Sequence, residues 1–127
     1  MKLVIVSTTI HGDKGYRDWD TLAHKSTFPD VHFVIAGDFH SPPFDASNFQ
    51  CSLEYLSADD QKSYACSESI GWKKWARRNI ALLRAMELQP DYILVIDDDN
   101  RPHENYFDDW HRILTNTTNK EIVCDSD

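Results

Sequence analysis

Three consecutive carboxylates, Asp97, Asp98 and Asp99, are the residues whose type and spacing point most directly to chemistry. They follow an apolar run at 92–96, Tyr-Ile-Leu-Val-Ile, which predicts a strand buried on both faces in the middle of a parallel sheet. Side chains alternate along an extended chain, so Asp97 and Asp99 lie on one side and Asp98 on the other. Two such carboxylates repel each other unless a hard divalent cation, usually one that also holds phosphate oxygens, lies between them. The sequence favours a cation site at Asp97 and Asp99. His103 is the one histidine placed to add a ligand to it. The alternative is an acidic turn that binds no ligand.

Polar side chains also follow two earlier apolar runs. Thr8 and Thr9 come after the first run, and Asp38 comes after the second run, at 31–36. Ligands of open parallel sheets bind beyond the carboxyl ends of the strands, so these side chains should open on the same edge as the three carboxylates. Two hydroxyls and a carboxylate suit a ribose or the edge of a pyrimidine. Each is also a common turn residue, so only the combination predicts a site.

The region 69–87 predicts the clearest amphipathic helix. At about 100° per residue, its apolar face carries Trp72, Trp75, Ala76, Asn79, Ile80, Leu83 and Met86. A buried amide must find hydrogen bonds, so Asn79 either makes a structural bond or belongs to the site. Arg77 and Arg78 flank this face, where they are either solvated or able to reach the carboxylates. The forked guanidinium suits phosphate.

The remaining pattern completes an α/β domain. Strands are predicted at 3–6, 31–36, 91–96 and 121–124, a weaker edge strand at 51–56, and helices at 16–25, 69–87 and 104–114. This order predicts a three-layer α/β sandwich with a mainly parallel sheet, formed as a single domain by residues 1–127.

The composition argues against several classes of function. A net charge of −8 argues against nucleic acid or an anionic membrane as the main partner. Three widely spaced cysteines, Cys51, Cys66 and Cys124, fit neither a disulfide framework nor a zinc site and indicate a reducing compartment. No stretch is apolar enough to span a membrane, and no Walker A loop, GxGxxG motif or Ser nucleophile elbow occurs. We therefore expect a cytoplasmic protein without membrane insertion.

The stretch 69–102 resembles the nucleotide-sugar-binding half of the GT-A-fold glycosyltransferases. The resemblance is carried by the Arg-Arg-Asn of the predicted helix at 77–79, the strand at 91–96, and the DxD motif within Asp97-Asp98-Asp99-Asn100, followed by Pro102. This version of the motif is closest to the group of the reversibly glycosylated polypeptides, or UDP-arabinopyranose mutases. Two threonines after the first strand fit the same pattern, while 1–68 otherwise resembles it only loosely.

This resemblance implies a Rossmann-like GT-A fold and a metal-dependent glycosyltransferase, or its donor-binding domain, that uses a UDP-sugar. It implies that Asp99, beside Asp97, ligates Mn²⁺ or Mg²⁺ bridging the diphosphate, while Asp97 and Asp98 bind the ribose or the donor sugar. The residues implied to bind the nucleotide or its sugar are Thr8, Thr9, Asp38, Arg77, Arg78, Asn79, Asp97 and Asp98. No residue is implied as the catalytic base.

Enzymes of this group continue well beyond the DxD motif with an acceptor-binding half, whereas few residues follow Pro102 here. We expect a fragment, a donor-binding module or half of a homo-oligomeric enzyme, with slow hydrolysis and no transfer to an acceptor, whether glycan, protein or small molecule. A non-catalytic nucleotide-binding or interaction domain with the same fold is the alternative. A phosphotransferase of the haloacid-dehalogenase type is disfavoured because its DxD would follow the first strand.

Overall fold

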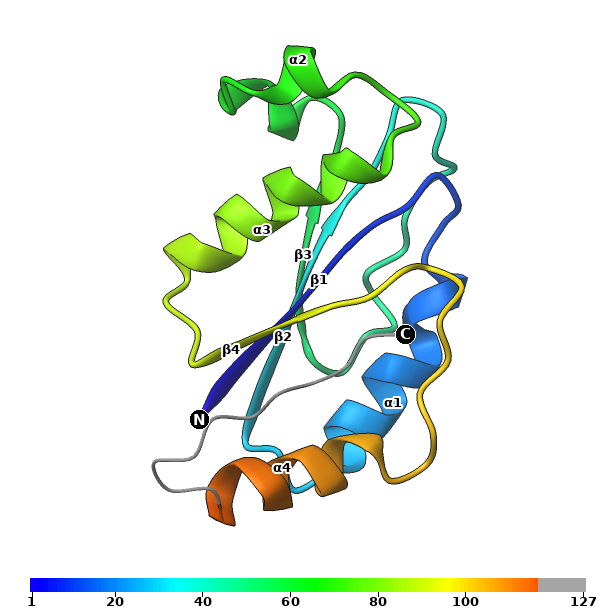
Figure 1. The fold of residues 1–127 in the computed structure, drawn as a ribbon. Helices are drawn as coiled ribbons and strands as arrows, with labels where there is room; N and C mark the ends of the chain where they lie inside the picture. The colour runs from blue at the N-terminus through cyan, green and yellow to red at the C-terminus, as the bar shows by residue number, and fades with distance from the viewer. Residues whose placement is uncertain (117–127) are drawn as a thin grey trace.

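Residues 1–116, which the computed structural model describes, fold around one four-stranded sheet in which all strands are parallel (Figure 1). The order across the sheet is β3-β2-β1-β4. The strands are β1 (Lys2–Thr8), β2 (Asp30–Ala36), β3 (Ser52–Leu56) and β4 (Tyr92–Val95). The prediction of an α/β domain with a mainly parallel sheet is confirmed, as is the edge strand near 51–56. The strand predicted at 121–124 lies outside the described residues.

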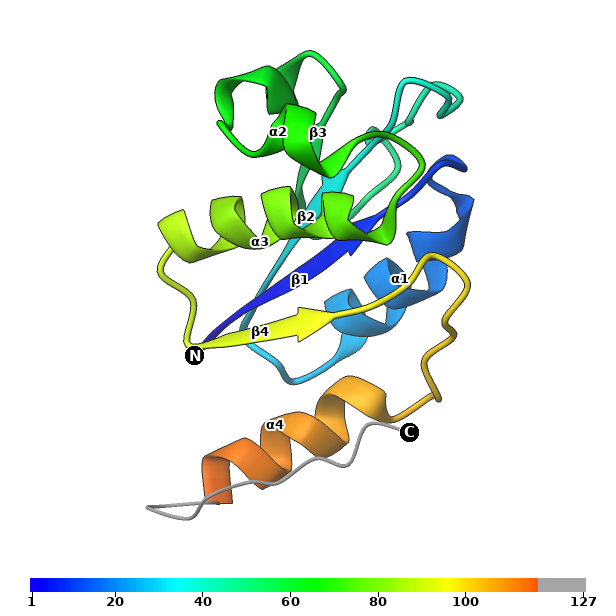
Figure 2. The same ribbon diagram turned by 45° about the horizontal axis from the view of Figure 1, so that its top comes forward.

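Helices cover both faces of this sheet (Figure 2). α1 (Arg17–Lys25) and α4 (Tyr106–Asn116) lie on one face, and α3 (Arg78–Glu87) lies on the other. α2 (Ser67–Ile70) is a single short turn on the way from β3 to α3. Among residues 1–116, no helix combines the length and the apolar character needed to cross a membrane.

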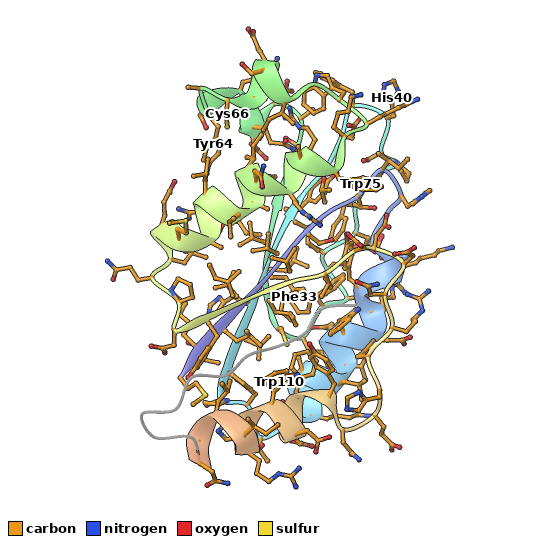
Figure 3. The ribbon with its side chains drawn as sticks, in the orientation of Figure 1. Phe33, His40, Tyr64, Cys66, Trp75 and Trp110 are labelled. Carbon is orange, nitrogen blue, oxygen red and sulfur yellow. The ribbon has the colours of Figure 1, made fainter. Side chains whose placement is uncertain are left out.

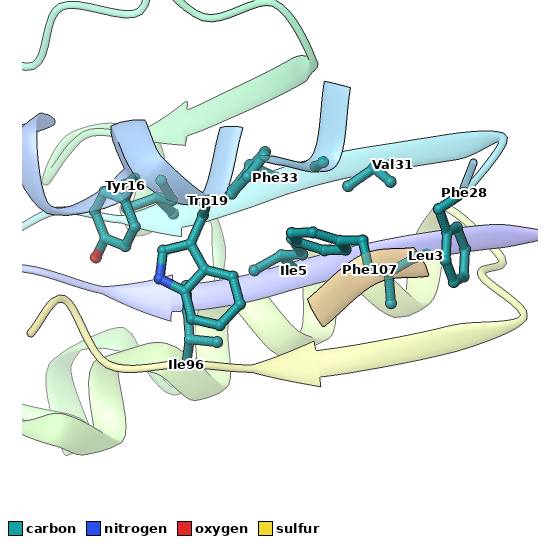
Figure 4. Close-up of a cluster of buried hydrophobic side chains, with 11 residues drawn as sticks. Leu3, Ile5, Tyr16, Trp19, Phe28, Val31, Phe33, Ile96 and Phe107 are labelled. Carbon is teal, nitrogen blue, oxygen red and sulfur yellow. The ribbon is translucent and has the colours of Figure 1, made fainter. Parts of the chain in front are cut away.

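The alternation of side chains along β1 divides the interior into two cores. Leu3 and Ile5 pack with α1 and α4 in a core rich in aromatic rings, which includes Trp19 (Figure 4). Val4 and Val6 pack with α3 among small and aliphatic side chains. The central strand therefore anchors both helical layers.

The strand order creates a crevice at one end of the sheet. α1 connects β1 to β2 across one face, and α3 carries the chain back across the other face to β4 (Figures 1 and 2). The chain therefore adds β2 and β3 on one side of β1 and then returns to add β4 on the other side of β1. Open parallel sheets bind ligands at such a switch point, beyond the carboxyl ends of the strands.

The prediction of a continuous helix over 69–87 is wrong. After α2 the chain passes through positive φ angles at Gly71 (78°) and Lys73 (55°), and it resumes with a 3₁₀ turn, Trp75–Arg77, that leads into α3. A positive φ is incompatible with a right-handed helix. The break produces a loop at 71–75 over the edge of the sheet.

The same break changes which side of α3 is buried. Ile80 and Ala81 are buried, whereas Asn79, which the apolar pattern predicts to be buried, is exposed. The pattern fails because its phase is set by Trp72 and Trp75, which lie before the helix begins. Asn79 therefore needs no buried hydrogen-bond partner, and the argument that linked it to the site no longer applies.

β4 is an edge strand of the described sheet and not a central one. Tyr92, Ile93 and Val95 are 38%, 37% and 44% exposed, because no strand within residues 1–116 lies beside the outer edge of β4. Ile96, directly after β4, is buried in the aromatic core. The continuous apolar run thus predicted the strand correctly, and within residues 1–116 the strand lies at an edge of the sheet.

Arg77, predicted to lie near the phosphate, is instead buried inside the molecule and only 1% exposed. Its guanidinium donates from Nε to Oε1 of Gln61 (3.0 Å) and from Nη1 to the carbonyl oxygens of Ser67 (2.6 Å) and Gly71 (3.2 Å). Gln61 in turn donates to the carbonyl oxygens of Gly37 and Leu56, at the ends of β2 and β3. The arginine therefore ties the segment before α3 to the sheet.

Replacing Arg77 by Met should lower the free energy of unfolding by about 3 kcal/mol, because the acceptors on Gln61, Ser67 and Gly71 would remain buried without donors. Urea unfolding followed by circular dichroism measures this loss. The matched control is Arg78→Met, one residue further along and partly exposed, which should change stability by about 0.5 kcal/mol or less. Equal midpoints for the two variants would show that Arg77 is not the structural anchor.

Candidate functional site

A cleft of about 510 Å³ opens at the carboxyl edge of the sheet, at the switch point beside β1. Its walls come from the ends of β1, β2 and β4 and from the loop that precedes α3. The residues that line it are Thr8, Thr9, Ile10, His11, Asp38, Lys73, Lys74, Trp75, Arg78, Asp97, Asp98 and Asp99. Segments far apart in the sequence thus converge on one site.

The three carboxylates lie on a turn that closes on itself. The amide of Asp97 donates to the side-chain oxygen of Asn100 (2.8 Å), and the amide of Asn100 donates to the carbonyl of Asp97 (3.2 Å). The indole of Trp19, from the aromatic core, donates to the carbonyl of Asn100 (3.1 Å). The turn is therefore held by its own hydrogen bonds and by Trp19 of α1.

Within this acidic turn, the three side chains have different partners. Asp98 accepts a hydrogen bond from the hydroxyl of Thr9 (2.7 Å), which turns it toward the end of β1. Asp97 lies 3.5 Å from the guanidinium of Arg78. Asp99 is exposed and has no hydrogen bond or ion pair to another side chain among residues 1–116. Asp99 is thus the carboxylate most open to a ligand.

Gly15 allows the turn to lie against the chain that follows β1. A Cβ atom at Gly15 would lie 2.3 Å from the carbonyl oxygen of Asp98, closer than any real contact. The next residue, Tyr16, is fully buried and shares a hydrogen bond of 2.9 Å with the hydroxyl of Ser7. Burial raises the pKa of this phenol above its ordinary value. Tyr16 therefore supports the start of the loop from within the core.

Asp38 fixes the opposite wall. This carboxylate is 6% exposed and accepts hydrogen bonds from the amides of His40 (3.1 Å) and Lys73 (2.7 Å). The second bond holds the loop 71–75 at the point where Lys73 adopts its positive φ. Asp38 therefore organises the cleft, and both of its oxygens already have donors.

The cleft carries charges of both signs. Lys73, Lys74 and Arg78 line the side that leads into α3, and Arg78 reaches Asp97 of the acidic turn. Isolated carboxylates would suit a cation, and isolated basic groups would suit an anion. A ligand that is itself an anion with a bound divalent cation, such as a metal diphosphate, complements both.

The protein side chains alone do not form a complete metal site. In the described part of the chain, no group of three or more His, Cys, Asp or Glu side chains could hold a metal ion. His103 does not line the cleft, and its Nε2 lies 3.4 Å from a carboxylate oxygen of Asp109. Asp97 and Asp99 both line the cleft, and carboxylate oxygens are the ligand type that Mg²⁺ commonly takes together with phosphate oxygens and water.

The structure brings together most of the residues that the sequence marks for this site. Thr8, Thr9, Asp38, Arg78 and the three carboxylates all line the cleft. Arg77 and Asn79 do not, because the break in the predicted helix buries the first and exposes the second.

Sequence reasoning missed the loop residues Lys73, Lys74 and Trp75, and also Ile10 and His11 after β1, all of which line the cleft. Gly71 is the one sequence signal that could have revealed the loop, since an isolated glycine in a helical pattern suggests a break.

Known proteins offer no further guide: no family model matches the chain, and neither the curated proteins nor the solved structures contain a match. The chemistry of the cleft is therefore inferred from its own geometry.

Replacing Gly15 by Ala should displace the acidic turn, because the new methyl group would overlap the carbonyl oxygen of Asp98. We expect a loss of roughly 1–3 kcal/mol in the free energy of unfolding, measured in urea. Gly12→Ala is the matched control in the same loop, because the nearest atom to its Cβ would be Cγ of Pro42 at 3.6 Å, an ordinary contact. The prediction is contradicted if both variants unfold at the wild-type midpoint.

Proposed function

We propose that the cleft binds a nucleoside diphosphate sugar together with Mn²⁺ or Mg²⁺, and that the chain is a metal-dependent glycosyltransferase or its donor-binding domain. The donor we propose is a UDP-sugar, on the basis of the resemblance over 69–102, and the fold we propose is a short Rossmann-like domain of the GT-A type.

The observation that carries this proposal is the pairing of opposite charges across one cleft at the switch point of the sheet. Asp97 and Asp99 offer hard oxygen ligands, and Arg78 with the two lysines of the loop offers positive charge. Such an arrangement suits a diphosphate whose charge is shared between a cation and basic side chains. A simple sugar needs neither, and a free divalent cation gains nothing from the basic wall.

Each residue has a part in this proposal that follows from its position. Asp97 and Asp99 would hold the cation, and Arg78 would donate to a phosphate oxygen once the ligand arrives. Asp98 is directed by Thr9 toward the end of β1, where a ribose or donor sugar would meet it. The cation, when bound, supplies Lewis acidity that stabilises the charge developing on the leaving diphosphate.

The second candidate is a nucleotide-binding or interaction domain without turnover. It is favoured by the hydrogen bonds that two carboxylates of the cleft already make: both oxygens of Asp38 are bonded and Asp98 is bonded to Thr9, so neither is poised as a base. Incubation with a panel of UDP-sugars and Mn²⁺ separates the two candidates. Release of UDP supports the enzyme, and stable binding without release supports the interaction domain.

Replacing Asp99 by Asn should abolish metal-dependent UDP binding and leave the fold intact. The substitution removes an exposed ligand of the cation, and it also relieves repulsion with Asp97, so stability without metal should hold or rise. Calorimetric titration of UDP in Mn²⁺ measures the first effect and thermal unfolding without metal measures the second.

Asp59→Asn is the control for the Asp99 variant, because Asp59 is an exposed carboxylate outside the cleft that pairs with Lys62. It should bind UDP as wild type does. Unchanged UDP affinity in the Asp99 variant would refute the metal assignment. No heat with UDP and Mn²⁺ in the wild-type chain would refute the function itself.

Replacing Arg78 by Met should change the two affinities in opposite directions. Its guanidinium pairs with Asp97, so its removal frees a carboxylate and should tighten the binding of Mn²⁺ alone by about two- to fivefold, as expected for a partly exposed ion pair. UDP binding in saturating Mn²⁺ should weaken by at least a similar factor, because a phosphate donor is lost. If both affinities move in the same direction, Arg78 does not alternate between Asp97 and the ligand.

A further inference from the structure

Trp75 is the most exposed large apolar side chain of the described residues, with 84% of its surface open to water. It lines the cleft and precedes α3, beside the loop that follows β1 (Figure 3). Ile10, from that loop, also lines the cleft and is 41% exposed. A tryptophan left in water forgoes a large gain from burial, so its position at a charged cleft calls for an explanation other than packing.

The exposure of Trp75 does not come from a loose segment. The amide of Lys73 is held by the buried carboxylate of Asp38 at 2.7 Å, and the carbonyl of Gly71 accepts a hydrogen bond from Arg77. Lys73 is kept in a left-handed conformation that a lysine rarely adopts. The loop is therefore fixed in a conformation that leaves Trp75 uncovered.

The neighbouring tryptophan shows the contrast. The ring of Trp72 packs 4.2 Å from the ring of Phe39, measured between centroids, and the guanidinium carbon of Arg77 lies 3.7 Å from its centre on the ring face. Trp72 thus has partners on the protein, while its neighbour in the loop has an open face at the cleft. Of these two tryptophans of one loop, Trp72 packs against protein side chains and Trp75 remains exposed at the cleft.

The side chains that could bond the edge of a base are largely committed to the protein. The hydroxyl of Thr8 donates to the carbonyl of Ala36 (2.8 Å), the hydroxyl of Thr9 donates to Asp98, and both oxygens of Asp38 accept bonds. A flat apolar surface is what the cleft still offers to a planar ring. Stacking on an aromatic side chain suits every nucleobase because each has a π face.

We propose that Trp75 is the platform on which the nucleobase of the ligand stacks, with Ile10 as a second apolar side chain that lines the same cleft. This inference rests on the proposed function and assigns a residue to the recognition of the base. The basic loop residues and the acidic turn hold the metal diphosphate, while Trp75 distinguishes a nucleotide from an inorganic pyrophosphate.

The test compares two ligands, UDP and pyrophosphate, each titrated calorimetrically in saturating Mn²⁺ into the wild-type chain and into Trp75→Leu and Trp75→Phe. Stacking on one aromatic ring is commonly equivalent to about tenfold in affinity, so Trp75→Leu should weaken UDP binding by about that factor. Trp75→Phe should retain most of the affinity. Pyrophosphate should bind all three proteins alike, which also verifies that the variants are folded.

Met86→Ala is the control for loss of an exposed apolar side chain, because Met86 is 59% exposed on α3 and does not line the cleft. Two outcomes would overturn the inference. UDP could bind the Leu variant as tightly as wild type, or pyrophosphate could lose as much affinity as UDP. If neither UDP nor pyrophosphate binds wild type, the proposed function fails with it; if both bind wild type and the Leu variant alike, only the role of Trp75 fails.

Discussion

The buried guanidinium of Arg77 is the interaction on which the ligand-facing end of the molecule depends. A charge that is 1% exposed and has no hydrogen-bonded carboxylate must be stabilised by dipoles, and Gln61, Ser67 and Gly71 supply them. Burial lowers the pKa of Arg77 from its ordinary value, while the negative charge of Asp38 opposes this effect. Because these acceptors come from three separate segments, satisfying one side chain fixes the end of the sheet, the turn of α2 and the loop before α3 together.

The two walls of the cleft depend on different cores. The acidic turn is positioned from the aromatic core, through the contact at Gly15 and the indole of Trp19. The basic loop is positioned from the other face, through Arg77 and through Asp38. β1 lies between them and contributes Thr9, whose hydroxyl reaches Asp98. The two walls are therefore positioned independently on either side of the sheet, and they meet at the ion pair of Asp97 with Arg78.

The sequence predicted the parts of this arrangement that depend on local pattern. The residues that end buried parallel strands, such as Thr9, Asp38 and Asp97, could be placed at one edge because parallel strands share an edge. The parts it mispredicted depend on tertiary contacts. In the sequence, Arg77 looks like an ordinary basic residue on the face of a helix. Its burial is explained only by its hydrogen bonds to Gln61 and Ser67, which lie in earlier segments of the chain. The positive φ of Lys73 likewise depends on Asp38, 35 residues away in sequence, and nothing local predicts it.

The partners that the carboxylates have within the protein bear on the order in which ligands would bind. Asp97 is paired with Arg78, and Asp98 is bonded to Thr9, so the turn already neutralises part of its own charge. A cation alone would have to displace Arg78 and would leave that guanidinium without its partner, facing a new positive charge. A diphosphate removes this conflict, because it gives Arg78 an anionic partner and gives the cation further oxygen ligands. Under the proposed function, entry of the metal together with the diphosphate is therefore favoured over a site preloaded with metal, and this coupling arises from the ion pair between Arg78 and Asp97.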